Sequence, residues 1–187
     1  HWISLDIIAY LRLVSGTGNT RANWLRIMNR PNRYIKREAL APFTSDISVA
    51  QLKAYYQDKD WMLERLDRLE YDLSIMKRMS PYAAIHYLSN AMKYQDYLKD
   101  YAKEHHINEQ ELLDVLNAVH ESSQSCRTFA EWFTYIDTYT EELQKQAKSP
   151  ASNDANNESG VCLCTLHCAK GLEYPIVFIP DINEDNI

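Results

Sequence analysis

Glycine is scarce in this chain, and that scarcity limits the possible folds more than any other feature. Only four glycines occur in 187 residues, at positions 16, 18, 160 and 171. In a long sequence that alternates polar and apolar residues with a helical period, so few glycines favour helices. The period is clearest from residue 60 to residue 78, where apolar residues recur every three or four positions: Trp61, Leu63, Leu66, Leu69, Leu73 and Met76. The sequence therefore predicts a mainly helical body.

Local signals mark where several of these helices begin and end. Asn108 with Glu111, and Thr128 with Glu131, have the spacing of a capping box, in which two side chains satisfy the free amides at a helix start. Pro31 is expected to end the second helix, since proline cannot continue one. The expected helices cover residues 4–14, 20–28, 48–56, 60–78, 81–101, 108–119 and 128–139.

Residues 161–179 differ from everything before them, because β-forming residues flank a short polar turn. The turn carries five polar or small residues that stand out: Thr165, His167, Lys170, Gly171 and Glu173. A buried strand pair with polar groups at its edge is a common ligand site in α/β domains. Two short strands do not make a stable sheet alone, so their partner strands are expected outside this chain, or the strands dock on the helices.

The charge balance bears on nucleic-acid binding. Lys and Arg number 20 against 26 Asp and Glu, for a net charge of −6 and a pI of about 5.5. A domain that wraps duplex DNA on its own normally has a basic excess, because phosphate neutralisation supplies most of the affinity. The balance argues against strong autonomous DNA binding. One local basic cluster remains between Arg26 and Arg37, with five cations and no acid.

Several classes of protein are excluded or disfavoured. No apolar run approaches the roughly 20 residues that span a bilayer, so no membrane contact is expected. The chain lacks an initial Met and a secretory signal, and we interpret it as a piece of a longer cytoplasmic protein. The four cysteines do not have zinc-site spacing and are expected to be small buried hydrophobic residues, with no metal: Cys126, Cys162, Cys164 and Cys168.

The polar turn also resembles a known motif. The run Thr165-Leu-His-Cys-Ala-Lys-Gly-Leu-Glu-Tyr-Pro-Ile-Val-Phe178 is similar to motif V of the UvrD/Rep/PcrA-like superfamily 1 DNA helicases, T-x-H-x-[AS]-K-G-L-E-[FY]-x-x-V-[FI]. Residues 5–13, Leu-Asp-Ile-Ile-Ala-Tyr-Leu-Arg-Leu, resemble the K-D-hh-A-Y-L-R-h helix of the same family. Residues 24–33 resemble its next helix, which ends in h-N-x-P-x-R.

The resemblance implies an organisation in four parts. Residues 1–30 would be helices on the side of motor domain 2A, and residues 31–150 the helical 2B-like insertion. Residues 151–160 would be a linker, and residues 161–187 the motif V strand-turn-strand of 2A. The implied fold class is mainly α: a helical 2B-like subdomain with a small β segment that belongs to a RecA-like α/β domain.

The resemblance also implies roles for individual residues. Lys170, Gly171 and Glu173 would bind ATP, with Lys170 and Glu173 counted as catalytic. Thr165 and His167 would contact single-stranded DNA, because hydroxyl and imidazole donors suit phosphate oxygens. Three basic residues, Arg33, Lys36 and Arg37, would contact duplex DNA. The implied cofactors are ATP and Mg²⁺, and the implied activity is ATP-dependent 3′–5′ helicase action in DNA repair.

Two departures from the family pattern matter. Many relatives follow the N-x-P-x-R element with a Gly-Ile-Gly turn that approaches duplex DNA, whereas this chain has Tyr34-Ile35-Lys36. The chain also contains no G-x-x-x-x-G-K-[ST] phosphate loop, so we expect it to be unable to hydrolyse ATP alone.

Two alternatives remain. The chain could come from the helicase half of a RecB/AddA-like recombination nuclease, which has a similar motif V. It could also act chiefly as a regulatory protein-interaction module, which its acidity and the Tyr34-Ile35-Lys36 departure favour.

Overall fold

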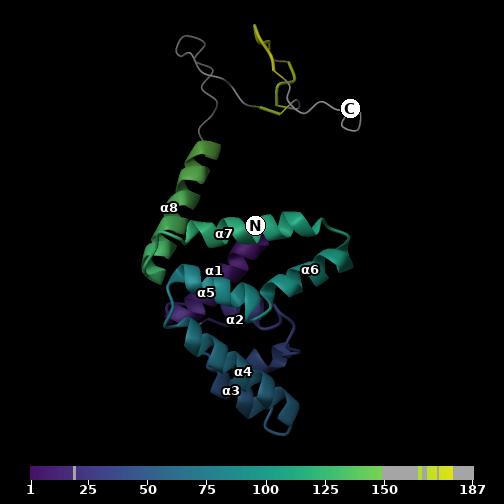
Figure 1. The fold of residues 1–187 in the computed structure, drawn as a ribbon, viewed down its shortest axis with the longest axis vertical. Coiled ribbons are helices and arrows are strands. Elements are labelled where there is room, and N and C mark those ends of the chain that lie inside the picture. Colours follow the sequence, from purple (N-terminus) through teal and green to yellow (C-terminus); the bar gives the residue numbers. More distant parts are fainter. Residues whose placement is uncertain (19, 149–163, 166–167, 172, 179–187) are drawn as a thin grey trace. The chain divides into compact units, whose positions relative to one another are not determined.

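The computed structural model describes residues 1–18, 20–148, 164–165, 168–171 and 173–178. The chain divides into two compact units, His1–Gln146 and Ala147–Ile187, and each is described by itself. The described helices are α1 Trp2–Ser15, α2 Arg21–Ile27, the 3₁₀ helix η1 Arg37–Leu40, α3 Val49–Tyr55, α4 Asp60–Met76, α5 Pro81–Asn90, α6 Tyr94–His105, α7 Glu109–Ser122 and α8 Phe129–Lys148 (Figure 1). The prediction of a mainly helical body is confirmed.

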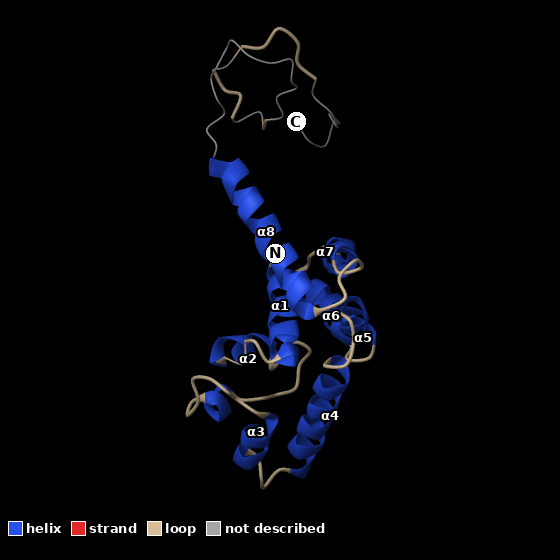
Figure 2. Ribbon diagram, turned by 90° about the vertical axis from the view of Figure 1, so that its left-hand side faces the viewer, coloured by secondary structure: helices blue, strands red, loops and turns tan. Residues whose placement is uncertain are grey.

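Helix α1 is the centre of the first unit. It packs against α2, α4, α5 and α7, and Figure 2 shows it between α2 on one side and the α5–α7 group on the other. Its buried residues recur at helical spacing and include Ile3, Ile7, Tyr10 and Val14. Burying such a stripe on several sides stabilises the unit through the hydrophobic effect, by about 1.5–3 kcal/mol for each large apolar side chain.

Helices α3 and α4 form a second layer that packs below α1 and against η1. The predicted apolar stripe of α4 is only partly the buried one. Leu66 and Leu69 are buried as expected, but Trp61 is exposed and Met62 takes a core position instead. At the start of α4 the buried stripe therefore includes Met62 instead of Trp61, and the Trp61 side chain is exposed.

The turn between α5 and α6 corrects one prediction. Residues 81–101 are expected to form one helix, but the helix stops at Asn90 and restarts at Tyr94. Lys93 adopts the left-handed conformation, with φ of 61°, which no continuous α-helix accommodates. The break redirects the chain so that Leu88 of α5 and Tyr94 of α6 are both buried in the core. The stabilisation from burying these two side chains thus outweighs the local preference for one continuous helix.

The second unit is described only in parts. Its described residues include turn conformation at 168–171 and bends at 175–176, and none of them belongs to a strand. The two predicted strands therefore stay a prediction, and residues 161–163, 166–167 and 179 lie outside the described residues, as does the predicted linker. Cys164 and Cys168 are exposed, which corrects the expectation that they are buried. No described helix is long and apolar enough to cross a membrane.

Candidate functional site

The motif-like turn is built around Thr165. Its carbonyl oxygen accepts a hydrogen bond from the Ala169 amide at 3.0 Å, which closes one helical turn. Its hydroxyl accepts from the Cys168 amide at 3.2 Å, as an N-cap residue does at the start of a helix. Gly171 follows with φ of 85°, the left-handed conformation that commonly ends a helical turn and that glycine adopts at little cost. The spacing of Thr165 and Gly171 thus has a local structural reason.

The polar side chains predicted to act in this turn are placed as follows. Lys170 and Glu173 are exposed, and His167 lies outside the described residues. The apolar residues that follow are exposed as well: 75% of the Ile176 surface and 86% of the Phe178 surface are accessible. Exposed apolar residues in succession indicate a surface that is usually covered by other structure.

The second predicted site is the loop that follows α2, and Asn29 fixes its shape. The Asn29 side-chain oxygen accepts from the Arg33 amide at 3.3 Å and from the Ile35 amide at 2.9 Å, while its Nδ2 donates to the Ile35 carbonyl at 2.8 Å. One side chain therefore folds residues 29–35 into a closed loop. Each unpaired buried amide would otherwise destabilise the fold.

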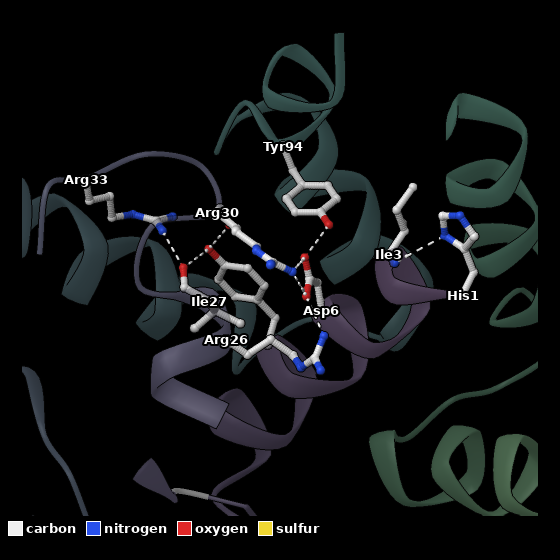
Figure 3. Close-up of polar contacts among 9 residues, drawn as sticks. His1, Ile3, Asp6, Arg26, Ile27, Arg30, Arg33 and Tyr94 are labelled. Carbon is white, nitrogen blue, oxygen red and sulfur yellow. Dashed lines mark hydrogen bonds and ion pairs between the residues drawn. The ribbon is translucent and has the colours of Figure 1, made fainter. Parts of the chain in front are cut away.

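Arg33 points back into this loop. Its Nη1 donates to the Ile27 carbonyl at 3.1 Å (Figure 3). The same nitrogen donates to the Pro31 carbonyl at 3.2 Å, and the guanidinium lies 5.9 Å from the centre of the Tyr10 ring. The sequence suggests Arg33 as a phosphate contact, but its Nη1 already ties the loop to α2. Lys36 and Arg37, by contrast, have exposed side chains.

A buried carboxylate on α1 holds the same loop in place. Asp6 of α1 is 0% exposed and accepts from Arg30 at 2.9 Å, from Arg26 at 3.1 Å and from the Tyr94 hydroxyl at 2.9 Å. Figure 3 shows the three partners converging on it. The Arg30 carbonyl in turn accepts from the Tyr10 hydroxyl at 2.8 Å. Through Arg30, the 29–35 loop is thus held to both α1 and α6.

The electrostatics of this cluster follow from burial and charge. Burial, followed by the Asp6 carboxylate, raises the pKa of Tyr94, so its hydroxyl stays protonated and keeps donating. Burial works to lower the pKa of Arg30, but its ion pair with Asp6 outweighs this and the pKa is raised. Both partners therefore keep the proton that the cluster requires.

Tyr34 is the first residue of the Tyr34-Ile35-Lys36 segment. Its φ is 61°, so a residue with a side chain adopts the left-handed conformation here. Tyr34 is 60% exposed, and the Arg65 guanidinium lies 4.9 Å from the centre of its ring. Arg65 also lies 5.2 Å from the centre of the Trp61 ring. Cation–π contacts of this kind hold Arg65 between two exposed aromatic rings.

The cluster of Tyr34, Trp61 and Arg65 was not predicted from the sequence, although a signal was present. Trp61 and Arg65 are four residues apart, so they share one helix face. Assigning Trp61 to the apolar stripe concealed that pairing.

A family model described as UvrD-like helicase C-terminal domain matches residues 4–187. The chain is 26% identical over 195 aligned residues to the ATP-dependent DNA helicase PcrA of Bacillus subtilis strain 168, covering 96% of this chain and 26% of that protein. It is 24% identical over 197 residues to PcrA of Staphylococcus aureus strain Mu50, covering 96% of this chain and 25% of that protein.

The chain thus spans about a quarter of the length of the curated relatives that it matches. No solved structure shows significant similarity to it. The family match extends over nearly all of the chain, including both the α1–α2 region and the Thr165 turn. The chain belongs to the UvrD-like helicase C-terminal domain family.

Proposed function

We propose that this chain is part of an ATP-dependent DNA helicase that moves 3′ to 5′ along single-stranded DNA and unwinds duplex DNA. The observation that supports this most is the Thr165 turn, in which a helical turn ending at Gly171 presents Lys170 to solvent. The PcrA relatives, whose name describes them as ATP-dependent DNA helicases, support the same activity.

Lys170, Gly171 and Glu173 would hold ATP from the motor-domain side. The residues fit this role: Lys170 offers an exposed ammonium to phosphate oxygens, and the exposed Glu173 carboxylate accepts hydrogen bonds from ribose hydroxyls. ATP supplies the free energy of phosphoryl transfer when it is bound. Mg²⁺ would accompany ATP in the parent protein.

Thr165 and His167 would contact the backbone of the single strand, next to the nucleotide. One rigid turn that touches both ligands would couple nucleotide binding to the grip on the strand, because each ligand then changes the affinity for the other. The Thr165 hydroxyl accepts from the Cys168 amide and still carries its own proton, which is available for a phosphate oxygen.

The chain would belong to two parts of that helicase. Residues 1–30 and 161–187 would be part of the RecA-like motor domain 2A, with residues 151–160 as the linker and 31–150 as the 2B-like insertion. The exposed Ile176, Val177 and Phe178 support this, since they would be covered by partner strands of the motor sheet.

The test uses the complete parent protein with Lys170→Ala and Glu173→Gln. We expect each to lower DNA-stimulated ATP hydrolysis at least about tenfold, a change of about 1.4 kcal/mol in the barrier. The matched control is Lys103→Ala with Glu104→Gln, exposed residues of the same types on α6, which should leave turnover unchanged. Unchanged turnover in both motif variants would contradict the proposal.

A further inference from the structure

A hollow of about 670 Å³ opens on the surface of the helical unit, between the end of α1, the end of α4 and the start of α8. Seven described residues line it: Arg12, Ser15, Thr17, Lys77, Phe129, Ala130 and Phe133. Its volume lies within the range of roughly 300–1,000 Å³ that is usual for ligand pockets. These residues include two cations, two aromatic rings and no acid, which suits an anion that carries an apolar group.

Arg12 is held in place at the wall of this hollow. Its carbonyl oxygen accepts a hydrogen bond from the Gly18 amide at 3.2 Å, so the turn after α1 folds back on it. A Cβ atom at Gly18 would lie 2.8 Å from the Arg12 Cβ, closer than real Cβ atoms approach, so this packing requires glycine. The Arg12 guanidinium lies 5.9 Å from the centre of the Phe133 ring. The cation is thus positioned before a ligand binds, which lowers the entropy cost of binding.

The positive charge in the hollow is not paired with a carboxylate. Arg12 and Lys77 form no ion pair within the part of the chain that the structure describes. The hydroxyl groups are already engaged, since those of Ser15 and Thr17 lie 2.8 Å apart and the Ser15 hydroxyl donates to the Arg12 carbonyl at 3.1 Å. Recognition of an anion therefore depends on the two cations. A guanidinium suits this role, because its planar fork matches the two oxygens of a carboxylate.

The surrounding charges favour an occupant with a small negative charge. In the sequence that flanks the lining residues of α4 and α8, two exposed cations are matched by two exposed acids: Arg78, Arg127, Glu131 and Asp137. A nucleic-acid strand carries a charge on every residue, so it would meet both acids as well as the cations. A single carboxylate in the hollow would meet the unpaired cations alone.

The aromatic lining sets a second requirement for the occupant. Phe129 and Phe133 are four residues apart on one face of α8, and both are partly buried. A ligand gains affinity by burying an apolar group against them, next to its anion. In a polypeptide, a carboxylate and an apolar side chain share one carbon atom only at the C-terminal residue. Since none of the lining residues is fully buried, a free acid would keep much of its surface in water, whereas a peptide chain adds contacts along the rim.

We propose that this hollow binds the C-terminal residue of a partner protein, with its carboxylate on Arg12 and Lys77 and its apolar side chain against Phe129 and Phe133. The site is built from residues of the helical unit alone. It does not depend on the proposed helicase activity, and its test involves neither ATP hydrolysis nor unwinding.

The experiment measures peptide binding to the 187-residue chain by fluorescence anisotropy. The probe is a fluorescein-labelled peptide, Gly-Ser-Gly-Ser-Leu-Phe, with a free C-terminal carboxylate. We expect the same peptide with a C-terminal amide to bind at least about tenfold more weakly, because it lacks the charge that the cations recognise. Arg12→Gln and Lys77→Gln should each weaken binding of the free carboxylate at least about fivefold. Both should also reduce the difference between the two peptides.

Ala130→Met tests the hollow without removing a charge. Ala130 is exposed on α8, so a longer side chain there fills the hollow and leaves no cavity in the core, and methionine is a good helix former. We expect this variant to bind the peptide as weakly as the cation variants do, with an unchanged thermal midpoint. The matched control is Arg78→Gln, an exposed cation beside Lys77 that is not among the lining residues. It should bind as the unchanged chain does.

The proposal would be overturned by equal binding of the two peptides, by no binding of either, or by an equal loss in Arg78→Gln. Unchanged affinity in the three hollow variants would also overturn it. Both glutamine variants losing stability with the preference for the carboxylate intact would limit the two cations to stabilising helix C-termini. Displacement of the peptide by an equal concentration of 3-phenylpropionate would assign the hollow to free acids instead, and displacement by oligothymidylate would assign it to nucleic acid.

Discussion

At the scale of single residues, we expect a substitution at Asp6 to disturb the structure more than one at any predicted site residue. A carboxylate that is fully buried destabilises a protein unless cations and hydrogen bonds compensate it. Here Arg26, Arg30 and Tyr94 do so, and they come from α2, the start of the 29–35 loop, and α6. The position of the loop next to α1 therefore depends on one negative charge.

Replacing that charge tests the dependence. We expect Asp6→Asn to lower the free energy of unfolding by about 2–3 kcal/mol, because two arginines would face a neutral amide in a buried site. The magnitude is reduced because both arginine side chains are more than one third exposed and partly screened. Urea unfolding followed by circular dichroism measures it.

Glu70→Gln is the control for this change. Glu70 is paired with Lys53 at an exposed position, so its loss should cost no more than about 1 kcal/mol. Equal losses in the two variants would contradict the prediction, because the buried Asp6 carboxylate would then contribute no more than an exposed one.

At the scale of elements, helix α8 is fixed at its start by a complete capping box. The Glu131 carboxylate accepts from the Arg127 amide at 2.8 Å and from the Thr128 amide at 3.4 Å, and the Thr128 hydroxyl accepts from the Glu131 amide at 3.2 Å. The buried Trp132 follows immediately, so the cap also sets where that ring enters the core. We expect Thr128→Ala to lower the free energy of unfolding by about 1 kcal/mol, measured by urea unfolding.

The same cap predicts a pH dependence. Hydrogen bonds from the Arg127 amide, and then from Thr128, lower the pKa of Glu131 below its ordinary value of 4.5. The stabilisation is therefore present above about pH 4.5 and is lost as the pH falls through the lower folded-state value. Glu131→Gln should be less stable than the unchanged chain at neutral pH. The difference should shrink as the pH falls below about 4.5. A constant difference in thermal midpoint across the range would contradict this.

These caps were predictable, because their hydrogen bonds join residues four or fewer positions apart. The sequence predicts the Thr128–Glu131 box as the structure has it, and the Asn108 cap with one change, since Asn108 accepts from the Gln110 amide. The break before α6 was not predictable in this way, since only tertiary packing of Tyr94 favours a left-handed Lys93.

The candidate sites likewise combine local features, which could be predicted, with long-range contacts, which could not. The residues of the Thr165 turn stand out in the sequence because the turn is local. The contact of Arg33 with the Tyr10 ring and that of Arg65 with the Tyr34 ring could not be predicted, since each joins segments far apart in the chain.

At the scale of the whole molecule, the chain consists of a helical unit with its own core and a second unit with exposed apolar residues. We expect a chain that ends at Lys148 to unfold cooperatively, with a thermal midpoint within about 2 °C of the full chain, because the core side chains among the described residues precede that point. The full chain should bind the dye ANS, and the shortened chain should bind less. A large drop in midpoint would show that residues after Lys148 stabilise the helices.

The bond between Asp6 and Tyr94 joins residues 88 positions apart. Closing so long a segment carries an entropy cost, so nearby pairings such as α3 with α4 form more readily. During synthesis, Asp6 can pair with Arg26 and Arg30 soon after α1 is made, but its third partner is made only with α6. Nascent chains that stop before residue 94 therefore lack the hydroxyl that completes the cluster around α1.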